Sequence, residues 1–99
     1  MLWGKPTPDP LVGFHIAALY TPDSNKAITE DYKDYIQKLP PEEKKFAFLY
    51  NVFEDGTGQH AVKIEVDVNG TDRWFHILIY DKDNKRIRVI KYYNGRYQS

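Results

Sequence analysis

Three histidines, His15, His60 and His76, are the side chains of this chain best suited to bind a metal ion or to act as a general base. A metal site needs several nitrogen, oxygen or sulfur donors that converge on one point, and no two of these histidines have the spacing of paired ligands. The chain contains no cysteine, which excludes disulfides, thiolate zinc sites and a cysteine nucleophile. We therefore expect neither a metal site nor a cofactor.

The clearest candidate for catalysis is His60, which follows the glycine-containing segment 56–59 and heads an expected strand, while Asp81 ends the next one. Papain-like hydrolases place a histidine and an acid on adjacent strands, and this pair resembles theirs over a short stretch of chain. The nucleophilic cysteine of that family is absent, and a triad without its nucleophile loses most of its rate enhancement. The strand pairing derived below also puts Ile79, and not Asp81, opposite His60. The sequence therefore predicts that the protein is not an enzyme.

Two loops resemble ligand-binding motifs only in part. Gly56 and Gly58 are spaced as in a phosphate-binding loop, but such a loop leads into a helix, whereas here a strand follows. The segment 81–84 is similar to the start of a calcium loop, yet Arg86 and Tyr92 stand where that loop needs glycine and glutamate. We expect both segments to be ordinary turns.

Three segments of the C-terminal third alternate in the manner of strands, namely 60–68, 73–81 and 85–92. Asn69 and Gly70 suit a two-residue hairpin turn, because both tolerate the positive φ that this turn requires. That turn sets Val68 opposite Thr71 and so fixes the register of the first two strands. The expected partners are Val66 with Arg73, Ile64 with Phe75, Val62 with Ile77 and His60 with Ile79.

The segment 81–85 is expected to form a three-residue hairpin loop with Asn84 in the left-handed region. This loop pairs Ile79 with Ile87 and Ile77 with Val89. Ile77 should consequently be buried at the centre of the sheet.

Because side chains alternate along a strand, this register divides the sheet into two faces. One face is apolar and is expected to form the core, and it consists of Val62, Ile64, Val66, Phe75, Ile77, Ile79, Ile87 and Val89. The other, here called the mixed face, carries Lys63, Glu65, Asp67, Trp74, His76, Leu78, Tyr80, Arg86, Arg88, Ile90 and Tyr92. It is too aromatic for an ordinary solvated surface and too charged for a core.

The predicted binding site lies on the mixed face and comprises Trp74, His76, Tyr80, Arg86, Arg88 and Tyr92. Tryptophan, tyrosine and arginine are enriched among the residues that dominate protein interfaces. We therefore expect a small non-catalytic binding module whose partner is another protein or a second copy of the chain. The alternative is single-stranded nucleic acid stacked on the same side chains, which a steep dependence of binding on salt would reveal. A small ligand, or coverage by the N-terminal part of the chain, would also account for this face.

An amphipathic helix is expected between Thr21-Pro22, which suits its cap and first turn, and Pro40-Pro41, which ends it. Its apolar stripe comprises Ile28, Tyr32, Tyr35, Ile36 and Leu39. This stripe would pack on the apolar face of the sheet.

Two further segments, 11–20 and 41–54, fit both a helix and a strand, and we interpret both as helices. The expected fold is then α+β, with N-terminal helices packed on one face of a three-stranded antiparallel meander. If both segments are strands, the order becomes β-α-β-β-β-β, which resembles the cystatin-like arrangement. The Gln-x-Val-x-Gly and Pro-Trp motifs of cystatin inhibitors are absent, so that arrangement would not imply protease inhibition.

Length and composition indicate one domain over residues 1–99, since 99 residues with 41% hydrophobic content can bury a core, and 1–10 is expected to be an extended arm. The 14 basic and 14 acidic residues balance, which argues against a dedicated nucleic-acid binder. Only 81–99 is basic, with six basic and two acidic residues and hence a net charge of +4.

No stretch approaches the roughly 20 apolar residues of a membrane span. Residues 11–20 make a poor signal peptide, so we expect a cytoplasmic protein without membrane contact.

Overall fold

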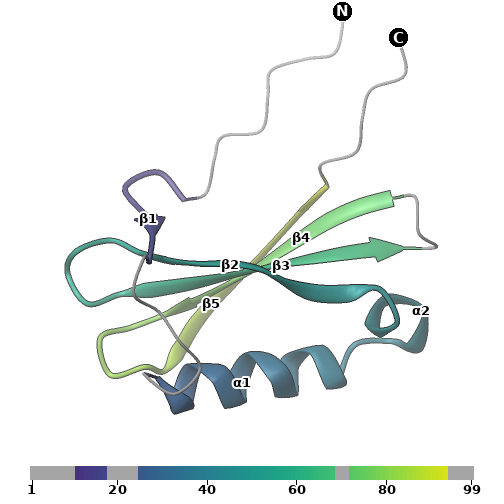
Figure 1. The fold of residues 1–99 in the computed structure, drawn as a ribbon, viewed down its shortest axis with the longest axis horizontal. Coiled ribbons are helices and arrows are strands. Elements are labelled where there is room, and N and C mark those ends of the chain that lie inside the picture. Colours follow the sequence, from purple (N-terminus) through teal and green to yellow (C-terminus); the bar gives the residue numbers. More distant parts are fainter. Residues whose placement is uncertain (1–10, 18–24, 69–71, 94–99) are drawn as a thin grey trace, which may run out of the picture.

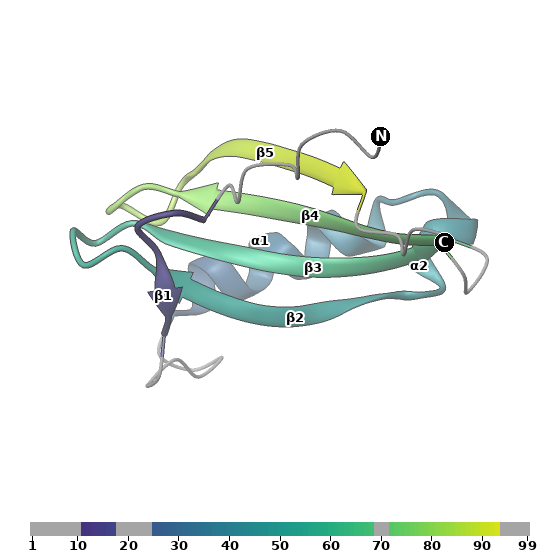
Figure 2. The ribbon, with the colours of Figure 1, turned by 90° about the horizontal axis from the view of Figure 1, so that it is seen from above.

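The computed structural model of the chain describes residues 11–17, 25–68 and 72–93. Within these segments the elements are β1 (His15–Ile16), α1 (Lys26–Gln37), α2 (Pro41–Lys44), β2 (Ala47–Glu54), β3 (His60–Val68), β4 (Asp72–Tyr80) and β5 (Arg86–Tyr93). The five strands form one antiparallel sheet in the order β1-β2-β3-β4-β5. Helix α1 crosses one face of this sheet, called the helix face below (Figures 1 and 2). The opposite face, on which the described part of the chain has no helix, is called the open face.

The α+β class is confirmed, but the sheet of the described segments has five strands and not three. The prediction of a helix over 41–54 is wrong for most of that segment, because α2 ends at Lys44 and β2 begins at Ala47. The prediction of a helix over 11–20 is also wrong where the structure describes it, since a turn there leads into β1. Strand β2 forms because it pairs with the buried strand β3. Local propensity does not take this tertiary pairing into account. The resulting element order is the β-α-β-β-β-β alternative with α2 inserted.

The apolar stripe of the predicted helix forms α1, which begins at Lys26 and therefore later than Thr21-Pro22 suggested. Asn25 is the N-cap, and its side-chain oxygen accepts a hydrogen bond of 3.2 Å from the backbone N–H of Ile28. Ile28 and Tyr32 are buried against the sheet, which explains why the helix is held in place. Residues 18–24, which include the expected cap, lie outside the described segments.

The register of β3 with β4 differs from the prediction by one residue. Val68 pairs with Asp72, so three residues and not two separate the paired ends of the hairpin. The actual partners are Val66 with Trp74, Ile64 with His76, Val62 with Leu78 and His60 with Tyr80. Because side chains alternate, a slip of one residue moves every side chain of β4 to the opposite face. The turn residues Asn69 and Gly70 themselves lie outside the described segments.

The loop between β4 and β5 has the predicted left-handed residue, since Asn84 has a φ of 65°. An irregularity between Ile79 and Tyr80 nevertheless shifts the pairing, and Ile77 lies opposite Ile90 instead of Val89. Sequence spacing alone does not reveal such a bulge.

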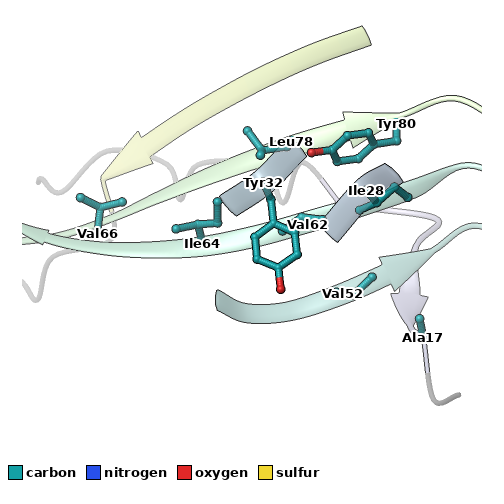
Figure 3. Packing of buried hydrophobic residues seen from close by; sticks show 9 residues of the cluster. All are labelled: Ala17, Ile28, Tyr32, Val52, Val62, Ile64, Val66, Leu78 and Tyr80. Carbon is teal, nitrogen blue, oxygen red and sulfur yellow. The ribbon is translucent and has the colours of Figure 1, made fainter. Parts of the chain in front are cut away.

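The sheet is buried on both faces near its centre. The cluster on the helix face contains Ala17, Ile28, Tyr32, Val52, Val62, Ile64, Val66, Leu78 and Tyr80 (Figure 3). The cluster on the open face contains Leu11, Ala61, Ile77 and Ile79, with Phe14, Phe53, Ile90 and Tyr92 packed against it. Ile77 is fully buried as predicted, but it lies on the face opposite to Val62. The apolar side chains of β4 therefore stabilise two separate clusters.

Candidate functional site

The six predicted binding residues do not share one face of the sheet. Those on the helix face are Trp74, His76, Tyr80 and Arg86, and those on the open face are Arg88 and Tyr92. The division follows from the irregularity in the pairing of β4 with β5, which sets Arg88 opposite Ile79 and Tyr92 opposite Phe75. The mixed face is therefore not a continuous surface in the structure.

Tyr80 and Arg86 hold α1 against the sheet. The Tyr80 side chain is fully buried, and its hydroxyl donates a hydrogen bond of 2.5 Å to the carboxylate of Asp31 on α1. The same carboxylate lies 3.4 Å from Nε of Arg86, whose guanidinium stands 5.3 Å from the centre of the Tyr35 ring. These contacts give both predicted site residues a structural role within the chain.

His76 is buried under α1 with 3% of its surface exposed. The hydroxyl of Tyr35 lies 2.9 Å from its Nδ1, and the two rings meet edge to face at 79°. Burial, and secondarily the charge of Lys91, lowers the pKa of His76 from 6.5 to about 4. Burial also raises the pKa of Tyr35. Both groups are therefore neutral near pH 7, and we assign the phenol as the donor to Nδ1, which leaves the imidazole proton on Nε2.

A cavity of about 230 Å³ opens beside His76 and is lined by Glu43, Trp74, His76 and Lys91. Glu43 comes from α2, which begins at Pro41 because proline suits the first turn of a helix. Lys91 comes from β5, directly opposite His76. Trp74 is partly exposed, and its ring lies 5.4 Å from that of Tyr93. The cavity thus combines an aromatic surface, a neutral imidazole and one charge of each sign.

Sequence reasoning found Trp74 and His76 but missed Glu43 and Lys91. The correct register would have placed Lys91 beside His76, because the two residues are cross-strand partners. No sequence signal brings Glu43 to this point, since its position depends on how α2 packs after α1.

On the open face, Lys63 is surrounded by aromatic rings of the same chain. Its ammonium lies 4.5 Å from the centre of the Phe75 ring, 5.1 Å from that of Tyr50 and 5.8 Å from that of Tyr92. A cation over aromatic faces is stabilised by the negative charge of the ring surfaces. Tyr92 therefore takes part in an internal contact, and this part of the open face is already occupied by the protein's own cation.

The edge strand β5 presents side chains that are not covered. Ile87, Val89 and Tyr93 expose 55%, 39% and 50% of their surface. The strand also carries three cations, Arg86, Arg88 and Lys91, and no acid. Of these, only Arg86 forms an ion pair within the described segments.

The catalytic pair considered from the sequence does not form. His60 lies opposite Tyr80, whereas Oδ1 of Asp81 accepts hydrogen bonds from the backbone N–H groups of Asp83 and Lys85 and so stabilises the β4–β5 loop. Within 11–17, 25–68 and 72–93, no three histidine, cysteine or acidic residues gather as metal ligands.

A second, more polar cavity of about 370 Å³ lies between the β2–β3 and β4–β5 loops, and it is lined by Thr57, Gln59, Asp81, Lys82 and Asp83. Oδ1 of Asp55 nearby accepts hydrogen bonds from the backbone N–H and the hydroxyl of Thr57. The acids at this end are thus used to hold the two loops in shape.

Comparisons of the chain with known protein families, with curated proteins and with solved structures found no match. None of the helices in the described segments has the length and apolar character needed to cross a membrane.

Proposed function

We propose that this protein is a non-catalytic interaction module that binds an extended, acidic segment of a protein partner along the edge strand β5. The observation that carries this proposal is the combination of three features on one eight-residue strand: an edge that no further strand of the described segments pairs with, three cations and three exposed apolar side chains.

The position of β5 supports strand addition. It is the last strand of the sheet, and Trp74 to Tyr80 of β4 pair along one side of it. The backbone N–H and C=O groups that point away from β4 can pair with an added strand, which is a common mode of peptide recognition. The apolar side chains of Ile87, Val89 and Tyr93 would then contact alternate side chains of the peptide.

The charge of β5 favours an acidic partner. Arg88 and Lys91 have no ion pair within the described segments, so acidic side chains on an added strand would gain contacts that the protein does not already supply. Pairing of β5 with β5 of a second copy would instead bring six cations together without an acid. Like charges on adjacent strands are destabilising, which disfavours self-association through this edge.

Single-stranded nucleic acid is the second candidate. The adjacent and partly exposed rings of Trp74 and Tyr93, with Lys91 on the same strand, are the types of side chain on which bases stack. Binding of this kind falls steeply with salt, whereas a strand held by main-chain hydrogen bonds responds less.

The test uses a peptide that alternates glutamate with valine, a matched peptide that alternates lysine with valine, and an oligothymidylate. Affinities are measured by calorimetry, and the binding surface is mapped from the backbone amide resonances. We expect the acidic peptide to bind, the amide shifts to concentrate on β5, and Arg88→Glu to weaken the affinity about tenfold or more. The matched control is Lys33→Glu, an equal charge change on the exposed side of α1.

Three outcomes contradict the proposal. Equal binding of the acidic and basic peptides would show that the cations of β5 do not select an acidic partner. Strong, salt-dependent binding of the oligothymidylate alone would favour single-stranded nucleic acid. A dimeric mass that Arg88→Glu does not change would mean that a second copy already occupies an edge of the sheet.

A further inference from the structure

The cavity beside His76 is lined by two opposite charges that do not neutralise each other. Glu43 and Lys91 both line it, yet within the described segments neither forms an ion pair with the other or with any further residue. Each charge is therefore available to a ligand. A molecule that carries a positive and a negative group could pair with both at once.

Each wall of the cavity suits a different part of such a ligand. The Lys91 ammonium attracts a carboxylate, and His76, which also lines the cavity, keeps an Nε2–H donor because its Nδ1 is bonded to Tyr35. The Glu43 carboxylate attracts an ammonium group. The partly exposed ring of Trp74 offers an apolar surface for a hydrocarbon or aromatic group.

We propose that this cavity is a binding site for a free amino acid with an apolar side chain, whose carboxylate pairs with Lys91, whose ammonium pairs with Glu43, and whose side chain packs on Trp74. The proposal goes beyond the proposed function, because it concerns a small ligand and does not depend on strand addition at β5.

The size and charge of the cavity favour a small ligand of zero net charge over other ligand classes. Its volume of about 230 Å³ lies below the roughly 300–1,000 Å³ typical of sites for drug-sized ligands, which suits a small ligand. A phosphate would be repelled by Glu43, and a divalent cation would meet one carboxylate and the charge of Lys91 among the described lining residues. Among the described residues of the lining, the charges sum to zero when His76 is neutral, which matches the zero net charge of an amino acid. The depressed pKa of His76 keeps it neutral near pH 7.

The experiment compares L-phenylalanine with two truncated analogues, 3-phenylpropanoate without the ammonium group and 2-phenylethylamine without the carboxylate. Binding to the full chain is measured by calorimetry at pH 7, together with the shift of the Trp74 indole resonance. We expect L-phenylalanine to bind at least about tenfold more tightly than either analogue, because each analogue leaves one charge of the cavity unpaired.

Two variants test which side chain pairs with each charged group of the amino acid. Lys91→Gln should reduce the affinity for L-phenylalanine to that for 2-phenylethylamine, and Glu43→Gln should reduce it to that for 3-phenylpropanoate. Lys33→Gln and Glu30→Gln, which remove equal charges from exposed positions of α1, should leave binding unchanged. Because Lys91 is exposed and Glu43 is half-buried, neither substitution should unfold the protein, and the amide spectra verify this.

The proposal is overturned if either analogue binds as tightly as L-phenylalanine, or if phenylalanine, leucine and tryptophan all fail to bind at millimolar concentration. It is also overturned if the control variants lose as much affinity as the cavity variants. Arg88→Glu, which tests the edge strand, should not affect amino-acid binding, so failure of one proposal is distinguishable from failure of the other.

Discussion

The side-chain amide of Asn25 donates a hydrogen bond of 3.0 Å to Oδ1 of Asn84, and this contact joins the N-cap of α1 to the β4–β5 loop. The other end of the Asn25 amide caps the helix by accepting from the N–H of Ile28. Asn84 is itself the non-glycine residue with positive φ in the described segments. One pair of side chains thus fixes the start of the helix relative to the loop.

We expect Asn84→Gly to destabilise the protein less than Asn84→Ala. Alanine loses the hydrogen bond and is strained in the left-handed region, which together should cost roughly 1–3 kcal/mol. Glycine loses the same hydrogen bond but tolerates positive φ, so its cost should be about 1 kcal/mol or less. Urea unfolding of the two variants checks this order. A glycine variant less stable than the alanine variant would show that backbone conformation at Asn84 contributes little.

Burial of His76 should make the stability of the protein depend on pH. Its pKa is about 4 in the folded chain against 6.5 for the free side chain. Above pH 6.5 both the folded and unfolded chains carry a neutral imidazole, and the stability is fully present. As the pH falls from 6.5 toward 4, only the unfolded chain binds the proton, so stability falls by at most ~1.4 kcal/mol per pH unit.

Urea unfolding from pH 7 to pH 4 measures this effect in the wild type and in His76→Gln. The carboxylates titrate in both proteins, so the difference between their two pH slopes isolates the imidazole. We expect the variant to lose less stability on acidification than the wild type. If stability falls equally with pH in the two proteins, the buried imidazole does not cause the loss of stability between pH 7 and pH 4.

The register of β3 with β4 predicts energetic coupling between Val62 and Leu78, which are cross-strand partners in the cluster on the helix face. The stability lost in the double variant Val62→Ala with Leu78→Val should differ by about 0.5 kcal/mol or more from the sum of the two single losses, because the two side chains share contacts. Val62→Ala and Ile77→Val should add, since Ile77 lies on the opposite face. Denaturant unfolding measures both pairs. If Val62 is instead coupled to Ile77 and independent of Leu78, the strands pair in the register expected from a two-residue turn.

The features that the sequence predicted correctly depend on local patterns. The apolar stripe of α1 follows from a repeat within one segment, and the left-handed Asn84 follows from the chemistry of one turn. Ile77 is buried in either register, because β4 is covered on both faces. None of these features requires knowledge of what the segment packs against.

The features that the sequence did not predict depend on tertiary packing. Segment 41–54 contains aromatic residues at both helical and strand spacing, and its pairing with β3 decides the outcome. One additional residue between the paired ends of β3 and β4 reversed the faces of Trp74 and His76 relative to β3. The irregularity between Ile79 and Tyr80 separated these two residues from Arg88 and Tyr92, and so divided the predicted site. Glu43 and Lys91 meet at one cavity only because α2 and β5 are brought together by the fold.

The ion pair between Glu65 and Arg73 provides a final test, on the open face. Oε1 of Glu65 lies 3.2 Å from the Arg73 guanidinium, and Glu65 is buried whereas Arg73 is partly exposed. The hydrogen bond and charge of Glu65 raise the pKa of Arg73. Removing Arg73 would leave a buried carboxylate without its cation, which is more costly than removing both charges.

We therefore expect Arg73→Ala to destabilise the protein, because the buried carboxylate of Glu65 loses its cation. Adding Glu65→Gln to this variant should recover part of the loss, because the neutral amide is less costly to bury than the carboxylate. Lys33→Ala, at an exposed position of α1, is the control and should change stability little. Urea unfolding at pH 7 measures the stability of the single and double variants. If the double variant is less stable than Arg73→Ala, the carboxylate of Glu65 has other stabilising contacts, and the ion pair is not what makes its burial tolerable.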